Sequence, residues 1–238
     1  MPISWEEKTG KAVADEAIST HHACVEPKRK MFIDELVSNL TTALPSNPYT
    51  FRVSVVDSPV VNAFAAPGGY VVIYKGLLKY TKSPEELAGV LAHEIEHVIH
   101  RHVTRILLQQ ASLGVVLGAL TGDLNGAMAV GAQAARFLGG LAYSRVAEEE
   151  ADREAIKLLT TAKIDPRGLV SFFERLQGGS HVEAGLSMYL STHPSLEDRI
   201  RALSVSDTGI PDTTHQLISP AEWGEMADMC FVHASSQK

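Results

Sequence analysis

Two histidines and a glutamate stand at a spacing that suits metal chemistry. Residues 93–97 read His-Glu-Ile-Glu-His, which fits the pattern H-E-x-x-H. On a helix, residues four apart are offset by only about 40° around the axis, so His93 and His97 leave the same face. Two imidazole nitrogens on one face suit Zn²⁺, which binds nitrogen at about 2.0–2.1 Å. Glu94 lies beside them, where a general base would take a proton from a water on the metal.

The surrounding residues predict a helix from residue 84 to about residue 110. Ser83 suits the N-cap, Pro84 suits the first helical position, and Glu86 completes a capping box. Apolar residues then recur at helical spacing: Leu87, Val90, Leu91, Ile95, Val98 and Ile99. A five-residue match also arises by chance on amphipathic helices, so the motif by itself leaves an ordinary buried helix as the alternative.

A hydrolytic zinc site needs a third protein ligand and an open fourth position. A histidine six residues after the second is one known solution, but Val103 stands there. A glutamate on a later helix is the other, and Glu148 lies in a strongly helical stretch at residues 143–153. Asp152 follows one turn later on the same face, where a carboxylate can orient a ligand histidine. The alternative interpretation of this stretch is a solvated acidic helix face.

Several motifs together resemble one family. H-E-x-x-H followed by S-R-x-x-E-x-x-A-D resembles the gluzincin peptidases of the HtpX, CAAX-prenyl-endopeptidase and BepA group. Residues 62–69 (Asn-Ala-Phe-Ala-Ala-Pro-Gly-Gly) and residues 192–194 (Thr-His-Pro) resemble two further motifs of that group, and all of them fall in order within about residues 50–203. The resemblance implies one Zn²⁺ per chain, with Glu94 as catalytic base, Asp152 supporting a ligand, and three metal ligands: His93, His97 and Glu148.

The resemblance also places His193 near the metal, on a loop, and leaves two roles open for it. In the first, His193 stabilises the oxyanion of the reaction, while Arg199 adds charge or braces Glu148. In the second, His193 occupies the fourth metal position and keeps the enzyme latent until the loop moves. On the residues alone, His193 is only the residue that precedes a helix starting at Pro194. His100 falls near the face of His93 and His97 and is interpreted as a histidine bonded to backbone or to a carboxylate, with a spare metal ligand as the alternative. His102 is expected to point elsewhere and is interpreted in the same way.

The rest of the chain predicts an α+β, mainly helical fold, a gluzincin-like metallopeptidase domain formed by residues 1–238 as one unit. Helices are expected at residues 4–20, 27–44 and about 220–232, and strands at 51–56, 60–64 and 70–74 form a small, mostly antiparallel sheet. By resemblance, residues 62–66 are the edge strand that borders the zinc cleft. An extended peptide would then add to the sheet along Asn62, Ala63, Phe64 and Ala65. On turn chemistry alone, a plain hairpin is equally compatible.

Composition bears on three questions: whether the chain binds nucleic acid, whether it contacts a membrane, and whether its cysteines form a disulfide. The chain is 45% hydrophobic and 21% charged with a net charge of −7, which argues against a nucleic-acid partner. Residues 111–141 are small and apolar but are split into halves too short for the roughly 20 residues of a membrane span. We interpret them as two buried or interfacial helices that leave contact with a membrane surface open. Cys24 and Cys230 would form a disulfide in an exported protein and stay reduced in the cytoplasm.

The start of the sequence lacks the apolar core of a signal peptide. The chain is therefore either cytoplasmic or lacks an upstream segment, and the resemblance favours a bacterial cell envelope protein, periplasmic or membrane-associated. The resemblance implies a zinc-dependent endopeptidase that acts on unfolded or misassembled envelope proteins. The alternative is a zinc-stabilised, non-catalytic, chaperone-like binding module. The sequence does not predict the oligomeric state.

Overall fold

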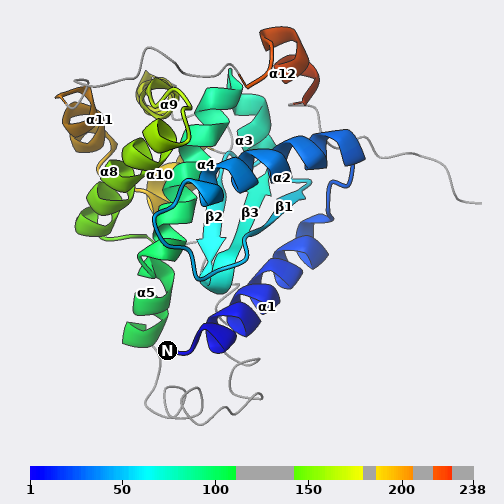
Figure 1. Cartoon of the computed structure of the whole chain (residues 1–238), viewed down its shortest axis with the longest axis vertical. Helices are drawn as coiled ribbons and strands as arrows, with labels where there is room; N and C mark the ends of the chain where they lie inside the picture. The colour runs from blue at the N-terminus through cyan, green and yellow to red at the C-terminus, as the bar shows by residue number, and fades with distance from the viewer. Residues whose placement is uncertain (111–141, 179–185, 206–216, 227–238) are drawn as a thin grey trace, which may run out of the picture.

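A computed structural model describes residues 1–110, 142–178, 186–205 and 217–226. The described part is mainly helical with one three-stranded sheet, as the sequence predicts (Figure 1). In chain order the elements are α1 (Ile3–His21), α2 (Pro27–Thr42), β1 (Arg52–Val56), β2 (Ala63–Ala66), the 3₁₀ turn η1 (Pro67–Gly69), β3 (Tyr70–Tyr74), α3 (Lys75–Tyr80), α4 (Pro84–Ile99), α5 (His102–Gln110), α8 (Arg145–Thr161), α9 (Arg167–Gly178), α10 (Leu186–Thr192), α11 (Leu196–Val205) and α12 (Pro220–Met226).

The sheet is small, as predicted, but it is mixed rather than mostly antiparallel. Its order is β1-β3-β2, and β3 pairs antiparallel with β2 and parallel with β1. The tight turn η1 joins β2 to β3 as a hairpin, whereas residues 57–62 carry the chain past the position of β3 to the far side. β2 therefore lies at an edge of the sheet. Asn62 lies just before this strand, and its carbonyl accepts a hydrogen bond from the Tyr74 N–H at 3.0 Å.

Glycine is required in the hairpin turn for two reasons. Gly68 has φ 75° and Gly69 has φ 92°, a region that side-chain-bearing residues rarely adopt. A Cβ on Gly68 would also lie 2.4 Å from the backbone nitrogen of Glu7 on α1. The Pro-Gly-Gly sequence therefore makes the turn and lets the N-terminal helix pack directly onto it.

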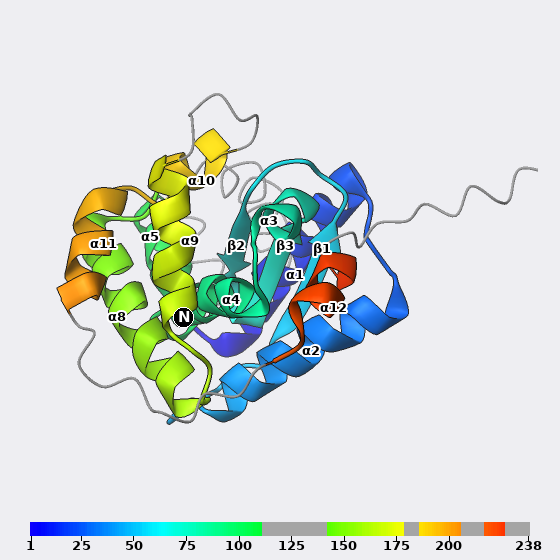
Figure 2. The same cartoon turned by 90° about the horizontal axis from the view of Figure 1, so that it is seen from above.

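Both faces of the sheet are covered, and α4 lies at the centre of the fold. Val71 and Ile73 of β3 join the main core with α4 and α2, whereas Val72 between them packs on the side of α1. Figure 2 shows α4 nearly end-on, with the sheet on one side and α8 and α9 on the other. The apolar run predicted for this helix is buried except for the partly buried Ile99 at its end, which fits a helix with apolar residues around most of its circumference.

The central helix ends earlier than the sequence predicts. α4 ends at Ile99 and α5 begins at His102, so the expected continuous helix to residue 110 is wrong. Between them Arg101 adopts a left-handed conformation with φ 56°. Its side chain bonds to Oε1 of the buried Glu6 at 2.9 Å and to the Met1 carbonyl at 2.7 Å. These contacts with the N-terminal segment stabilise Arg101 at the corner between α4 and α5.

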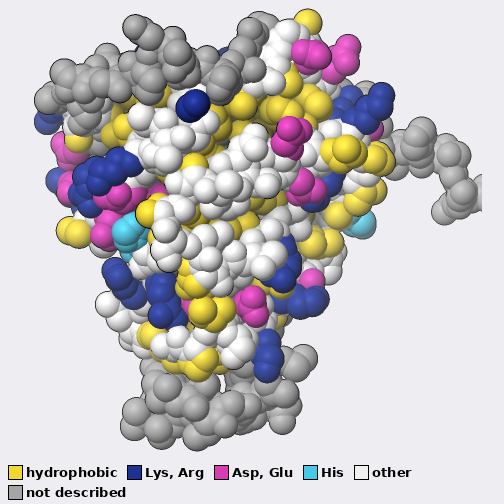
Figure 3. Space-filling view, in the orientation of Figure 1, with side chains coloured by type: hydrophobic (Ala, Val, Ile, Leu, Met, Phe, Trp, Pro, Cys, Tyr) yellow, Lys and Arg dark blue, Asp and Glu magenta, His cyan; other side chains and the backbone are white. Residues whose placement is uncertain are grey.

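The N-terminal helices are confirmed to within two residues at each end. The stretch at 111–141, with its expected membrane contact, lies outside the described residues, as does Cys230, so its bridge to the buried Cys24 stays a prediction. Of the helix expected at 220–232, the structure describes α12 as far as Met226. No helix in the described ranges has the length and hydropathy to cross a membrane. On the face in Figure 3, acidic and basic side chains are interspersed among apolar ones.

Candidate metal centre

A capped start fixes the helix that carries the H-E-x-x-H motif. The Ser83 hydroxyl accepts a hydrogen bond from the Glu86 N–H at 3.2 Å, as the capping box predicts. The Glu86 carboxylate accepts from the Lys82 N–H at 2.7 Å and from Arg175 of α9 at 2.8 Å. The first turn of α4 is therefore tied to α9, and His93 and His97 lie about two and three turns beyond Glu86 on the same buried helix.

The three predicted metal ligands meet in space. His93 and His97 present their Nε2 atoms 3.0 Å apart on α4. Glu148 faces them from α8, with Oε1 3.3 Å from His97 Nε2 and Oε2 3.7 Å from His93 Nε2. All three side chains are fully buried. Donors placed about 2.0–2.1 Å from a tetrahedral ion lie about 3.3–3.4 Å from one another, so these separations fit Zn²⁺.

Glu148 reaches this position because α8 begins just before it. The Ser144 hydroxyl accepts a hydrogen bond from the Ala147 N–H at 3.2 Å, so Ser144 caps the helix. Glu148 then lies in the first turn, on the side where α8 packs against α4. The serine of the S-R-x-x-E pattern therefore sets where the helix starts and so which way the glutamate points.

The protonation states in this cluster suit a cation. Burial lowers the pKa of His97 well below its usual range, the neighbouring His93 acts in the same direction, and Glu148 only partly opposes them. Burial would raise the pKa of the Glu148 carboxyl, but His193 and Arg199 lower it well below its usual range. A neutral imidazole and an ionised carboxylate are the forms that bind a metal ion.

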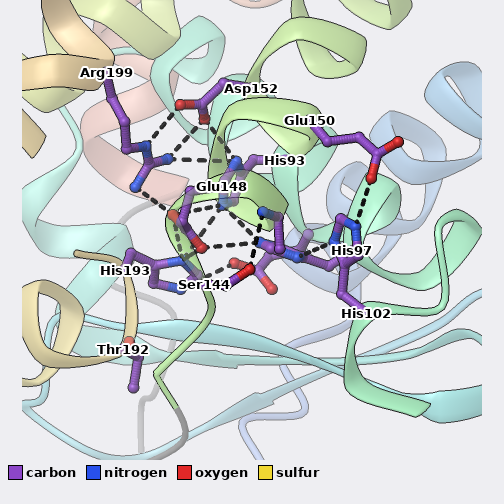
Figure 4. Close-up of polar contacts among 12 residues, drawn as sticks. His93, His97, His102, Ser144, Glu148, Glu150, Asp152, Thr192, His193 and Arg199 are labelled. Carbon is purple, nitrogen blue, oxygen red and sulfur yellow. Dashed lines mark hydrogen bonds and ion pairs between the residues drawn. The ribbon is translucent and has the colours of Figure 1, made fainter. Parts of the chain in front are cut away.

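Asp152 and Arg199 bond to two of the predicted metal ligands, His93 and Glu148. Asp152 Oδ1 lies 2.8 Å from His93 Nδ1, the ring nitrogen that faces away from the metal position. Arg199 of α11 binds both oxygens of Asp152, at 2.6 and 2.7 Å, and its Nη1 lies 2.5 Å from Glu148 Oε2 (Figure 4). The Arg199 guanidinium also lies 4.3 Å from the ring centre of Phe173. Of the two roles expected for Arg199, this geometry fits the bracing of Glu148.

His193 enters the cluster from the residue after α10. Its Nδ1 lies 3.2 Å from Glu148 Oε1 and 3.3 Å from His93 Nε2, so it completes a group of four donors within 4.8 Å of one another. Its Nε2 faces Glu94, at 3.5 Å from Oε1. Burial lowers the pKa of this imidazole, but the carboxylates of Glu148 and Glu94 outweigh it and raise the pKa above its usual value. The fourth position of the tetrahedron is thus within reach of His193.

Glu94 is buried beside the ligands with its bonding capacity unused. Neither carboxylate oxygen has a hydrogen bond of normal geometry from the described residues. Burial raises its pKa above the usual range, although His193, His93 and the backbone of Ala65 lower it in part. A buried carboxylate without hydrogen bonds of normal geometry is costly, so the site fits a metal and a water that would supply what Glu94 lacks.

The strand expected to bind substrate lies next to this helix but is not open. β2 packs against α4, and Ala65 is in contact with Val98 there. The four predicted residues are at most 8% exposed: Asn62, Ala63, Phe64 and Ala65. The side-chain oxygen of Asn62 is buried without a hydrogen-bond partner among the described residues. In this conformation the strand and the metal site are both closed to solvent.

Two aromatic rings flank the histidines, and the sequence patterns did not single them out. Tyr143 stacks on His97 with ring centres 3.8 Å apart and planes 16° apart. Tyr189 stacks on His193 at 4.5 Å. Tyr143 directly precedes the S-R-x-x-E motif, which is the one signal that draws attention to it, and Tyr189 has no comparable signal.

His102 was expected to point elsewhere than the face of His93 and His97, but it contacts the His97 ring on the side opposite the metal position. The corner at Arg101 turns the first residue of α5 back, so that His102 Nδ1 lies 2.8 Å from His97 Nδ1. The prediction that a carboxylate would hold it is correct, because its Nε2 lies 3.1 Å from Glu150 Oε2. Burial lowers the pKa of His102, and Glu150 opposes this only in part.

Comparison with known proteins agrees with this geometry. A family model described as Peptidase family M48 matches residues 25–206. The chain is 30% identical over 185 residues to the beta-barrel assembly-enhancing protease of Escherichia coli K12, covering 74% of this chain and 38% of that protein. It is 38% identical over 159 residues to mitochondrial metalloendopeptidase OMA1 of Arabidopsis thaliana, covering 65% of this chain and 31% of that protein. It is 31% identical over 212 residues to the OMA1 of Schizosaccharomyces pombe, covering 85% of this chain and 61% of that protein.

The chain thus spans less than two thirds of the length of each of these relatives. The family match nevertheless includes every residue of the metal cluster, on α4, α8 and the segment after α10. By this match, and in agreement with the motifs, the chain belongs to peptidase family M48.

Proposed function

We propose that this chain is the catalytic domain of a zinc-dependent endopeptidase. The observation that carries the proposal is the convergence of donors from two helices at tetrahedral separations, with the buried Glu94 carboxylate beside them. Two imidazoles and one carboxylate form a donor set typical of hydrolytic zinc sites. We assign His93, His97 and Glu148 as the ligands of one Zn²⁺ per chain.

The chemistry of the site follows from the position of Glu94. A bound Zn²⁺ would supply a Lewis acid that lowers the pKa of a water and polarises a peptide carbonyl. Glu94 takes a proton from the water while the water oxygen bonds to the carbonyl carbon. The protonated Glu94 then gives this proton to the leaving amine nitrogen as the C–N bond breaks. Its raised pKa favours the first transfer, because a carboxylate with a higher pKa is the stronger base.

A latent form of the enzyme is the second candidate, and the position of His193 favours it. Nδ1 of His193 lies at ligand separation from His93 and Glu148, which is where the substrate or water has to bind. The metal cluster is also closed to solvent. Replacing His193 with Ala separates the two roles: proteolysis rises if His193 blocks the metal and collapses if it stabilises the oxyanion.

For the substrate, we propose extended segments of unfolded or misassembled proteins. β2 lies at a sheet edge beside the catalytic helix, so a peptide could pair with its backbone once the site opens. Recognition through backbone hydrogen bonds selects for loose chains rather than for particular side chains. The names of the relatives refer to beta-barrel assembly and to mitochondria, and with the resemblance of the motifs they lead us to propose a membrane-associated setting in the cell envelope.

Chelator-sensitive cleavage of an unfolded protein tests this function directly. Purified protein should contain one zinc per chain and cleave casein, and a chelator should abolish cleavage until zinc is restored. The competing function is a non-catalytic, chaperone-like module. Such a module would bind casein and delay its aggregation but leave it intact, with or without zinc, both in the wild type and in the His193→Ala variant.

A further inference from the structure

We propose that His102 and Glu150 form a relay that holds the metal ligand His97 in one orientation and one tautomer. The inference rests on the metal site of the proposed function and adds two positioning residues to it. His102 and Glu150 act through His97 and do not touch the metal or the reacting atoms.

The relay is continuous in space although its members come from three segments. His97 lies near the end of α4, His102 opens α5, and Glu150 lies on α8. Nδ1 of His97 is 2.8 Å from Nδ1 of His102, and Nε2 of His102 is 3.1 Å from Oε2 of Glu150. Figure 4 shows His102 between its two partners, on the side of His97 away from Glu148. His97 and His102 are at most 3% exposed, so water is kept from the bond between the two rings.

Hydrogen-bond logic allows one arrangement when His97 binds a metal. Because its Nε2 faces the metal position, its proton must be on Nδ1, which then donates to the lone pair on Nδ1 of His102. The one proton of a neutral His102 is therefore on Nε2, where it is donated to the Glu150 carboxylate. Each group in the chain thus has a single role, and Glu150 fixes the tautomer of both rings.

The relay removes the rotation that stacking leaves free. Tyr143 lies flat on the His97 ring, 16° from parallel, and so fixes the plane of the ring but not its rotation within that plane. The bond to His102 fixes this in-plane rotation and aims Nε2 at the metal position. His93 has the same kind of support, from Asp152 at 2.8 Å, so each imidazole ligand is held at the nitrogen opposite the metal.

The neighbouring glutamates provide a matched control. Glu148 faces the metal, Glu150 accepts from His102, and Glu149 between them is exposed. Replacing Glu149 or Glu150 with Gln makes the same chemical change one residue apart on the same helix. Glu150 is 32% exposed at its side chain, so its substitution carries little risk to folding.

Two substitutions of His102 separate the relay from simple packing. The side-chain oxygen of Asn stands near the position of Nδ1, so His102→Asn keeps an acceptor for His97. The side-chain nitrogen of Gln stands near the position of Nε2, so His102→Gln keeps the donor to Glu150 and loses the acceptor. A role limited to filling space would favour His102→Gln, whose side chain is closer in size to histidine, whereas the relay favours His102→Asn.

The experiment measures the Zn²⁺ affinity of each metal-free variant by competition with a chromogenic chelator, with circular dichroism to check folding. Loss of a support of this kind weakens metal binding about 10–100-fold, and we expect this for His102→Gln. Glu150→Gln should fall at the lower end of that range, at about tenfold. His102→Asn should bind several-fold more tightly than His102→Gln, and Glu149→Gln should match the wild type.

Two results would overturn the relay while leaving the proposed function intact. One is Zn²⁺ binding by Glu150→Gln and His102→Gln that equals the wild type. The other is weakening in His102→Asn that equals or exceeds the weakening in His102→Gln. A wild-type protein that fails to bind one Zn²⁺ per chain would instead refute the metal site itself, and the relay with it.

Discussion

The two imidazoles that we propose as metal ligands, His93 and His97, are held in different ways. Behind His93 stands a buried, charged pair, because Asp152 and Arg199 are at most 3% exposed and bind each other through two hydrogen bonds. Behind His97 stands a second imidazole, His102, and then a carboxylate near the surface. We call these the Asp152 arm and the His102 arm. Both fix a ring nitrogen, but only the Asp152 arm buries opposite charges inside the fold.

The difference predicts what each arm contributes. A buried ion pair that loses one partner leaves an uncompensated charge, so the Asp152 arm couples the metal site to the stability of the whole fold. A neutral ring ending at a half-exposed carboxylate leaves no such charge, so the His102 arm should affect the metal and little else. The predictions below separate stability from metal binding, from the largest expected effect to the smallest.

Replacing Arg199 with Met should have the largest effect. It removes the cation that lies between Asp152 and Glu148 and leaves both buried carboxylates uncompensated. We expect the free energy of unfolding of the metal-free protein to fall by about 3–5 kcal/mol, measured with urea. Arg201→Met is the control on the same helix, because its side chain is 68% exposed, and it should change stability by less than about 0.5 kcal/mol. Equal effects of the two substitutions would contradict the charged character of the Asp152 arm.

Asp152→Asn compared with Glu150→Gln tests the two arms directly. Both changes remove one carboxylate charge and keep the shape of the side chain. Asp152→Asn weakens two charge-assisted bonds to Arg199, and we expect a loss of about 2 kcal/mol in unfolding free energy. Glu150→Gln should cost less than about 0.5 kcal/mol, although both variants bind Zn²⁺ more weakly. If Glu150→Gln lowers stability as much as Asp152→Asn, the distinction between the arms fails.

The corner at Arg101 directs His102 to His97, and the pH dependence of stability can test what holds this corner. The buried Glu6 carboxylate accepts hydrogen bonds from Arg101, Tyr49 and Thr104 at 2.9, 2.8 and 2.6 Å. Burial, together with the bond to Glu6, raises the pKa of Tyr49 to about 12. In the unfolded chain this pKa is about 10, so the stabilisation from Tyr49 is complete below pH 10 and is lost as the pH rises towards 12.

Tyr49→Phe should therefore cost about 1–2 kcal/mol of unfolding free energy at pH 8. The difference in unfolding free energy between wild type and variant should narrow by about 1 kcal/mol between pH 9 and pH 11, because only the wild type loses the stabilisation from Tyr49. Urea unfolding at each pH measures it. A gap that is constant or widens over this range would show that Tyr49 does not anchor the corner in this way.

The local part of the site could be predicted from the sequence. His93, Glu94 and His97 share a face because of helical spacing alone, and the structure places Glu148 and Asp152 one turn apart on the facing helix, as expected. These predictions depend on short-range periodicity, which the chain encodes within a few turns. The helical, α+β character of the fold could be predicted for the same reason.

Features that depend on distant contacts could not be predicted. The corner that directs His102 to His97 contains no glycine or proline, and it is stabilised by Glu6, which is 95 positions from Arg101 in the sequence. In the sequence, the helical pattern therefore continues through Arg101 without a sign of the break between α4 and α5. The parallel pairing of β1 with β3 was missed for a similar reason, since alternation marks the strands but not their order in the sheet.

The most direct test of the central claim is Glu94→Gln, with zinc content and casein cleavage measured on the same samples. The substitution is made in whichever background cleaves casein, the wild type or His193→Ala. We predict one zinc per chain, bound as tightly as in the parent, and a rate of cleavage lower by about 10²–10⁴-fold. Cleavage at the parental rate by the zinc-loaded Glu94→Gln protein, or zinc-loaded parents that both leave casein intact, would contradict the account.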